Sequence, residues 1–297
     1  MNLILAHGFL GFRKVFNLEY FRNVKQHLEA TFPLKVLVTE VDPASSITVR
    51  SGQLRRQILI ALNEVQPESE KERRLSGMFD PAAATHLIGH SMGGLDGRAL
   101  LSPANPDNLA GRIASLTTIS TPHRGSPIAD VIAARLDSKG LSLLERWFEM
   151  RLRDVLDDLG IPLEGLHDLT STASEAFNQK YVNHPEVRYF SVAGAARVSG
   201  RPTAKILYPA YKYIKRKTGE INDGLVSIKS ARWGEFDSEL WPADHAEEVG
   251  HDLDHLKPPK NFDYLAAFEM LVARLQDATN VSSHTVFPAK SGHLQLC

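Results

Sequence analysis

The sequence predicts a three-layer α/β fold, in which a mostly parallel central sheet is flanked by helices on both faces. Short apolar runs of strand length alternate along the chain with longer segments of helical periodicity. Strands of a parallel sheet with crossover helices must be covered on both faces, which gives the three layers. A chain of 297 residues can also bury roughly 75% of its unfolded surface, so one large domain with its own core is expected.

The elements follow in order. Apolar positions at Phe21, Val24 and Leu28 predict one amphipathic helix, and the charged stretch from Gln66 to Arg74 predicts a surface loop. A second helix is predicted by Leu54, Ile58, Ala61, Leu62 and Val65. The predicted strands are Asn2 to Ala6, Lys35 to Thr39, Thr85 to Ile88, Ser115 to Ile119 and Arg188 to Val192.

The alternation of strands and helices breaks between about residues 130 and 177. An apolar helical stripe in this segment predicts a helix inserted into the domain. We therefore expect one domain over residues 1–275 that contains the insertion, followed by a tail over residues 276–297 without a helical pattern. The stripe consists of Leu141, Leu144, Phe148, Leu152, Val155 and Leu159, widened by Leu143, Trp147 and Leu156.

Composition excludes several classes of protein. The net charge is −1, which gives the chain as a whole no electrostatic footprint for nucleic acid or for an anionic membrane. The basic run of Lys212, Lys215, Arg216 and Lys217 is expected to be a solvated face. No apolar run reaches the roughly 20 residues of a membrane-spanning helix. Cys297 is the only cysteine, so no intrachain disulfide is possible, and we expect a cytoplasmic protein.

The first candidate catalytic motif is GHSMG, at Gly89 to Gly93. This string follows a predicted strand and precedes GLDGRALL, a helix-forming stretch. A serine nucleophile at a sharp strand-to-helix turn requires this layout, because glycines two residues on either side let the chain pass closely. The sequence therefore predicts that Ser91 is a nucleophile.

At this point the sequence resembles the true lipases of the Pseudomonas and Burkholderia group and similar fungal triacylglycerol lipases. The matching segments occur in the family's order and cover about a third to a half of the chain. The resemblance implies an α/β-hydrolase fold with a helical cap or lid, and a serine carboxylic ester hydrolase of the lipase type. The segments are LAHGFLGF, VTEVD, HLIGHSMGGLDGRAL, SLTTISTPHRGSPIAD, YFSVAG, INDGLVSIKSARWG and DHAEEV.

A catalytic serine needs a base and an orienting acid, which in this fold follow in the order Ser, Asp or Glu, His. Asp223 matches the family's acid, although Asn222-Asp223-Gly224 alone would predict a tight turn. From the residues alone His245, His251 and His255 all qualify as the base, and the DHAEEV match favours His245. His251 and His255 are spaced i, i+4, so a metal site is an alternative to solvated loop histidines.

The resemblance also implies an oxyanion hole made of the backbone N–H groups of Phe9 and Met92. His7 and His90, which flank the site in sequence, are expected to be structural. His123 and Arg124 are expected to shape a loop near the pocket. Many relatives bind a structural calcium ion, and Glu247 resembles one of its carboxylates. The second would lie upstream of Asp223, where 198–218 holds no acid, so we expect no metal.

The sequence thus predicts a lipase-type enzyme that hydrolyses acylglycerols or similar lipid esters through an acyl-enzyme on Ser91, without a cofactor. The expected partners are the lipid ester and, through a mobile cap, transiently a lipid interface. We expect no nucleic-acid partner and no transmembrane segment. The alternatives are an acyltransferase or thioesterase with the same triad, a metal-dependent hydrolase, and a fold relic without activity.

Overall fold

The protein is built around a six-stranded sheet in which every neighbouring pair of strands is parallel. The computed structural model describes residues 1–9, 19–133, 164–196, 203–255 and 257–283. The strand order is β2-β1-β3-β4-β5-β6, so the first strand lies next to the edge strand β2, and the sheet then grows in the other direction from β3 to β6. This architecture confirms the predicted α/β class.

All five predicted strands are present. They are β1 (Asn2–Ala6), β2 (Lys35–Val38), β3 (Thr85–His90), β4 (Ser115–Ile119) and β5 (Arg188–Val192). Strands β1, β3 and β4 are buried along their whole length, as expected for strands that are covered on both faces, and β3 and β4 also bury several polar side chains. The sixth strand, β6 (Glu235–Phe236), escaped prediction because two residues carry no periodicity.

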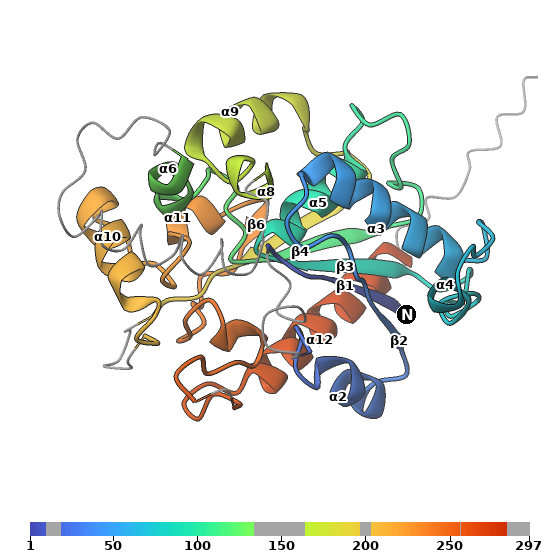
Figure 1. Ribbon diagram of the computed structural model, residues 1–297. Helices are drawn as coiled ribbons and strands as arrows, with labels where there is room; N and C mark the ends of the chain where they lie inside the picture. The colour runs from blue at the N-terminus through green and yellow to red at the C-terminus, as the bar shows by residue number, and fades with distance from the viewer. Residues whose placement is uncertain (10–18, 134–163, 197–202, 256, 284–297) are drawn as a thin grey trace, which may run out of the picture.

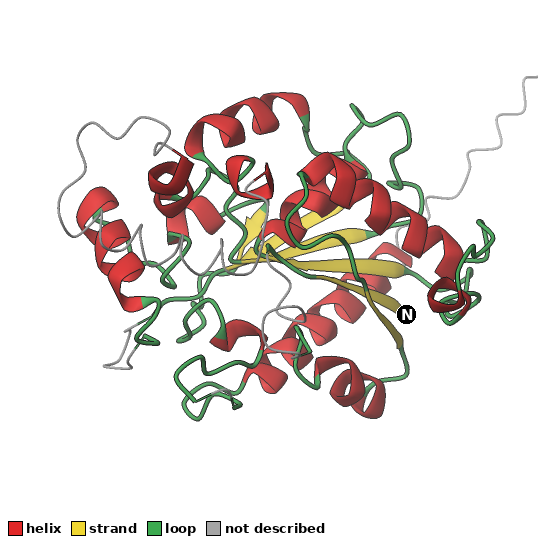
Figure 2. Cartoon of the chain, viewed as in Figure 1, coloured by secondary structure: helices red, strands yellow, loops and turns green. Residues whose placement is uncertain are grey.

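Helices cover both faces of the sheet (Figure 2). On one face lie α2 (Val24–Thr31) and the long α12 (Tyr264–Ser283), and on the other α3 (Ile47–Ala61) and α5 (Met92–Leu101) (Figure 1). One hydrophobic cluster joins Leu3 and Leu5 of β1 to α2 and α12. Another joins Ile4 of the same strand to α3 and α5, so alternate residues of β1 serve opposite layers.

The remaining helices lie mainly beyond the carboxyl ends of the strands (Figure 1). None of the described helices is long and apolar enough to cross a membrane. These helices are α6 (Pro127–Ala133), α8 (Glu164–His167), α9 (Ser171–Lys180), α10 (Tyr208–Thr218), α11 (Ile228–Ala231) and the 3-10 helix η3 (Glu247–Val249).

Two predictions about local structure differ from the structure. The expected loop from Gln66 to Arg74 contains a one-turn helix, α4 (Glu70–Arg73), because the side chain of Ser69 caps it by accepting from the backbone of Glu72. Helix α12 continues past the expected start of the tail at residue 276, to Ser283. The apolar stripe of the cap lies outside the described residues, so the cap stays a prediction.

Candidate active site

Ser91 lies between β3 and α5, with a left-handed backbone at φ 54°, ψ −129°. A non-glycine residue rarely adopts this conformation, and such strain concentrates at functional sites. Glycine is required on both sides of the turn. A Cβ at Gly89 would overlap the backbone of Gly93, and a Cβ at Gly93 would overlap the carbonyl oxygen of Ala6. The turn therefore has the geometry predicted for a nucleophile elbow.

Hydrogen bonds hold the turn in place. The N–H of Ser91 donates to the carbonyl oxygen of Ile119 at 2.9 Å, and the hydroxyl of Thr121 donates to the carbonyl oxygen of Ser91 at 2.7 Å. Met92 is the first residue of α5, where backbone N–H groups have no partner within the helix. The helix start therefore directs backbone donors toward the region of Ser91.

Asp223 and His245 come together as predicted, although 22 residues separate them. Nδ1 of His245 lies 2.7 Å from Oδ2 of Asp223, and both side chains are buried. The second carboxylate oxygen accepts from the backbone N–H groups of Leu225 and Val226, so this aspartate forms the tight turn and orients the histidine at once. The ring of His245 lies 4.5 Å, centroid to centroid, from that of His90, the residue before Ser91.

A capping arrangement fixes the backbone around His245. The carboxylate of Asp244 accepts from the N–H groups of Ala246 and Glu247, and the carboxylate of Glu247 accepts from the N–H of Asp244. Asp244 also accepts from the N–H of Ala204 at 2.9 Å. Burial raises the pKa of Asp244. The histidine loop is thus tied to the chain segment before α10.

The chain after β1 passes directly over Ser91. A Cβ at Gly8 would overlap both the Cβ of Ser91 and the hydroxyl of Tyr20, so only glycine allows this approach. Buried Arg50 donates to the carbonyl oxygen of His7 at 2.6 Å and pairs with Asp96 on α5. Phe9, whose N–H is the predicted second oxyanion donor, follows at once on this anchored loop.

His7 and His90, which were expected to be structural, both bond to buried groups of the protein. His7 accepts from the N–H of Val41, and burial, assisted by the positive charge of Arg50, lowers the pKa of His7 to about 4. His90 is fully buried between the hydroxyl of Tyr20 at 2.7 Å and the carboxyl of Glu248 at 3.0 Å. Burial holds the pKa of His90 well below its usual range, so both rings are neutral at pH 7.

Sequence reasoning missed Glu248. This carboxyl is fully buried, contacts His90, and accepts from the hydroxyl of Ser120 at 2.7 Å. Burial, and then the negative charge of Asp223, raise the pKa of Glu248 well above its usual range. Gly194 makes the space, because a Cβ there would overlap the carboxyl. The available signal was its place in DHAEEV, three residues after His245.

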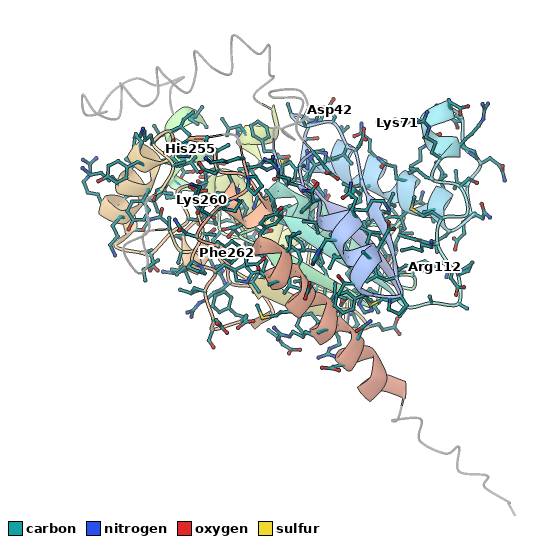
Figure 3. All side chains as sticks on the ribbon, turned by 90° about the horizontal axis from the view of Figure 1, so that it is seen from below. Asp42, Lys71, Arg112, His255, Lys260 and Phe262 are labelled. Atoms are coloured by element: carbon teal, nitrogen blue, oxygen red, sulfur yellow. The ribbon has the colours of Figure 1, made fainter. Side chains whose placement is uncertain are left out.

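The rival histidines point elsewhere. Nε2 of His251 donates to the backbone carbonyl oxygens of Glu19 and Tyr20 at 2.8 and 3.0 Å, which leaves that nitrogen unavailable to a metal. His255 is exposed and pairs with Asp252, on the segment ahead of α12 (Figure 3). Over the described residues, three potential metal ligands lie within 4.8 Å of one another only at His90, His245 and Glu248, and these side chains already bond to protein partners.

The described residues also do not fit a calcium site. The carboxylates of Asp244, Glu247 and Asp254 accept from backbone N–H groups, including those of Ala204 and Lys205. A calcium ion needs oxygen ligands, whereas this segment presents N–H donors to the histidine loop. Direct hydrogen bonds therefore join the parts of the chain that a metal would otherwise bridge.

His123 and Arg124 shape a loop, as predicted. His123 is fully buried, with its ring between Arg98 and the hydroxyl of Thr118. Arg124 donates to the carbonyl oxygens of Lys229 and Arg232, which fastens the loop after β4 to α11.

A strand-to-helix serine, a buried Asp–His pair and a six-stranded parallel sheet together are typical of the α/β-hydrolase fold, and comparison with known proteins agrees with that fold. No protein-family model matches the chain. It is 33% identical to triacylglycerol lipase 2 of Saccharomyces cerevisiae over 80% of this chain, and spans 64% of that protein's length. It is 28% identical to a triacylglycerol lipase of Pseudomonas fragi, over 84% of this chain and 87% of the relative.

Solved structures share the fold. The Staphylococcus hyicus lipase superposes with a TM-score of 0.66 at 18% identity, covering 95% of this chain and 97% of the other. A metagenomic carboxyl esterase gives a TM-score of 0.67 at 20% identity, covering 94% and 76%. The chain thus has the α/β-hydrolase fold, and its sequence is similar to triacylglycerol lipases.

Proposed function

We propose that the protein hydrolyses carboxylic esters of lipids through a covalent acyl-enzyme on Ser91. The observation that carries the proposal is the 2.7 Å contact between His245 and Asp223, on a chain whose Ser91 occupies a strained elbow. The carboxylate accepts from Nδ1–H and so fixes the tautomer in which Nε2 is the basic nitrogen.

In the proposed reaction, His245 takes the proton of the Ser91 hydroxyl while the oxygen attacks the ester carbonyl carbon. The C–O bond to the alcohol breaks as His245 returns the proton to the leaving oxygen. Water then attacks the acyl-enzyme by the same route, releasing the acid and free Ser91. Each turnover consumes one ester and one water.

The proposed oxyanion donors are the backbone N–H groups of Met92 and Phe9. The position of Met92 at the start of α5 and the close approach of Gly8 to Ser91 support this role. Each such donor contributes roughly 3 kcal/mol to stabilisation of the transition state. The anchoring of His7 by Arg50 would keep the loop preorganised.

The substrate class rests on the relatives. They are named triacylglycerol lipase, and the structural neighbours include lipases and a carboxyl esterase. These names favour hydrolysis over acyl transfer or thioester cleavage by the same triad. A metal-dependent hydrolase on His251 and His255 is not supported, because Nε2 of His251 donates to backbone carbonyl oxygens while His255 pairs with Asp252.

We further propose that the inserted cap, with its apolar stripe from Leu141 to Leu159, acts as a lid that opens at a lipid surface. Replacing Trp147 and Phe148 by serine should then lower activity on emulsified triglyceride more than on a soluble short-chain ester. A cap packed permanently on the core would instead lose both activities together, with a lower melting temperature.

The function is tested by hydrolysis of p-nitrophenyl esters and emulsified triglycerides of rising chain length, with Ser91→Ala as the matched control. We expect turnover on the long-chain or emulsified esters, at least 100-fold above the variant. Hydrolysis that is equal in the two proteins, or that disappears with a chelator, would contradict the proposal.

A further inference from the structure

Helix α10 presents a face that combines cations with exposed apolar side chains. Three of the strongly exposed large apolar residues of the described chain belong to it or flank it: Ile206, Tyr208 and Ile221, at 60%, 37% and 41% exposure. The buried side of the helix consists of Ala210 and Ile214, which pack against α6. The opposite side is therefore the one that faces solvent.

The outward face carries only positive charge. At 100° per residue, Lys212, Lys215 and Arg216 lie opposite the buried Ala210 and Ile214, and Lys217 extends the charge at the end of the helix. The stretch from residue 197 to 219 contains seven Lys and Arg residues and no Asp or Glu. Within the described part of the chain, no carboxylate forms an ion pair with any of the three lysines. A protein with a net charge of −1 thus concentrates cations on one helix.

The cationic face of α10 lies at the same end of the molecule as the candidate active site. Figure 1 shows α10 beyond the carboxyl ends of the strands, the end of the sheet at which Ser91 lies, and far from the start of β1. The helix ends at Thr218, five residues before Asp223, and Asn222 donates to the carbonyl oxygen of Tyr211. A surface that binds α10 would therefore lie close to the catalytic end of the molecule.

We propose that α10, with Ile206 and Ile221, docks on an anionic lipid surface and holds the catalytic end of the protein toward it. Lysine side chains reach the anionic headgroups while tyrosine and isoleucine enter the interfacial zone, which is the division of roles in interfacial helices. Charge complementarity favours an anionic lipid surface over a neutral one, because a neutral surface offers no partner to the lysines of α10. The contact involves no step of the reaction and goes beyond the proposed hydrolysis.

The test measures binding to vesicles in the Ser91→Ala background, so that no lipid is consumed. Vesicles of phosphatidylcholine alone are compared with vesicles of two parts phosphatidylcholine to one part phosphatidylglycerol. We expect binding to the anionic vesicles only, and weaker binding as salt rises. Replacing Lys212, Lys215 and Lys217 by glutamine should lower the affinity by about fivefold for each lysine, or about 100-fold together.

The matched control replaces three exposed lysines elsewhere, Lys35, Lys180 and Lys260, by glutamine. It makes the same change in net charge and should stay within about threefold of the parent. Unchanged melting temperatures show that both variants are folded. The proposal is overturned if the two triple variants bind alike, if neutral vesicles bind equally well, or if the surface binds single-stranded RNA and neither kind of vesicle.

Discussion

Glu248 combines full burial with an ionisable group beside the candidate catalytic acid. Its raised pKa means that the folded protein holds the proton more tightly than the unfolded chain. The resulting stabilisation is complete below the ordinary value of 4.5 and is lost progressively as the pH rises above it. Glu248→Gln removes the titration but keeps the size and neutrality of the side chain.

We therefore expect the unfolding free energy of the parent to fall relative to that of Glu248→Gln as the pH rises above about 5, as measured by urea denaturation. Glu248→Ala leaves His90 and Ser120 without this partner and should cost about 2–4 kcal/mol at about pH 5, with a smaller difference from the parent as the pH rises. Parallel stability profiles of the parent and the glutamine variant would contradict the assignment of a neutral Glu248.

The different contacts of His245, His251 and His255 predict different effects of replacing each by alanine. His245→Ala should lower kcat about 10⁴-fold, because the proposed nucleophile loses its base. His255→Ala should leave both kcat and melting temperature nearly unchanged, since the side chain is exposed. His251→Ala should lower the melting temperature through the loss of two buried hydrogen bonds, with kcat within about tenfold. A kcat loss at His251 or His255 as large as that at His245 would contradict this ranking.

At the scale of residues, the sequence predicted the candidate site residues that lie in recognisable motifs. Ser91 lies in a local string, and Asp223 and His245 follow in a fixed order. Tyr20 and Glu248 were not predictable, because their contacts with His90 span 70 and 158 residues of sequence. Such contacts exist only once the sheet has brought the segments together.

At the scale of elements, the start of α5 packs very closely against β1, at Gly93. Gly93→Ala would drive a Cβ into the backbone of β1, which cannot move without disturbing the sheet, so we expect a loss of about 2–3 kcal/mol. Gly52→Ala is the matched control, because a Cβ in the middle of α3 meets nothing within 4 Å. That variant should be more stable by about 0.5–1 kcal/mol. Thermal unfolding of both variants checks the pair, and equal effects would contradict the packing argument.

The difference between buried and exposed elements also explains which elements were predictable from the sequence. Strands β1, β3 and β4 are buried on both faces, and the apolar runs Leu3 to Ala6 of β1 and Leu87–Ile88 of β3 stand out in the sequence. Helix α4 buries no residue, so its charged sequence resembles a loop, and only the cap at Ser69 distinguishes it. The predicted end of the domain at residue 275 preceded the end of α12 because the last turns of that helix lack an apolar stripe.

For the whole molecule, topology converts distant motifs into one site. In a parallel sheet all carboxyl ends meet at one edge, so segments after β1 and β3 converge there with the loop that carries His245. Net charge, in contrast, is a poor guide at this scale. A value of −1 conceals the cationic α10, because acids elsewhere in the chain balance it.

The central claim is that Ser91 is the nucleophile activated by His245. The most direct measurement treats the folded protein with a serine-directed alkyl phosphonate and locates the adduct by peptide mass spectrometry. We expect one adduct, on Ser91, formed in step with loss of esterase activity and slowed at least 100-fold in His245→Ala. Labelling of a different serine, or inactivation without an adduct on Ser91, would contradict the account.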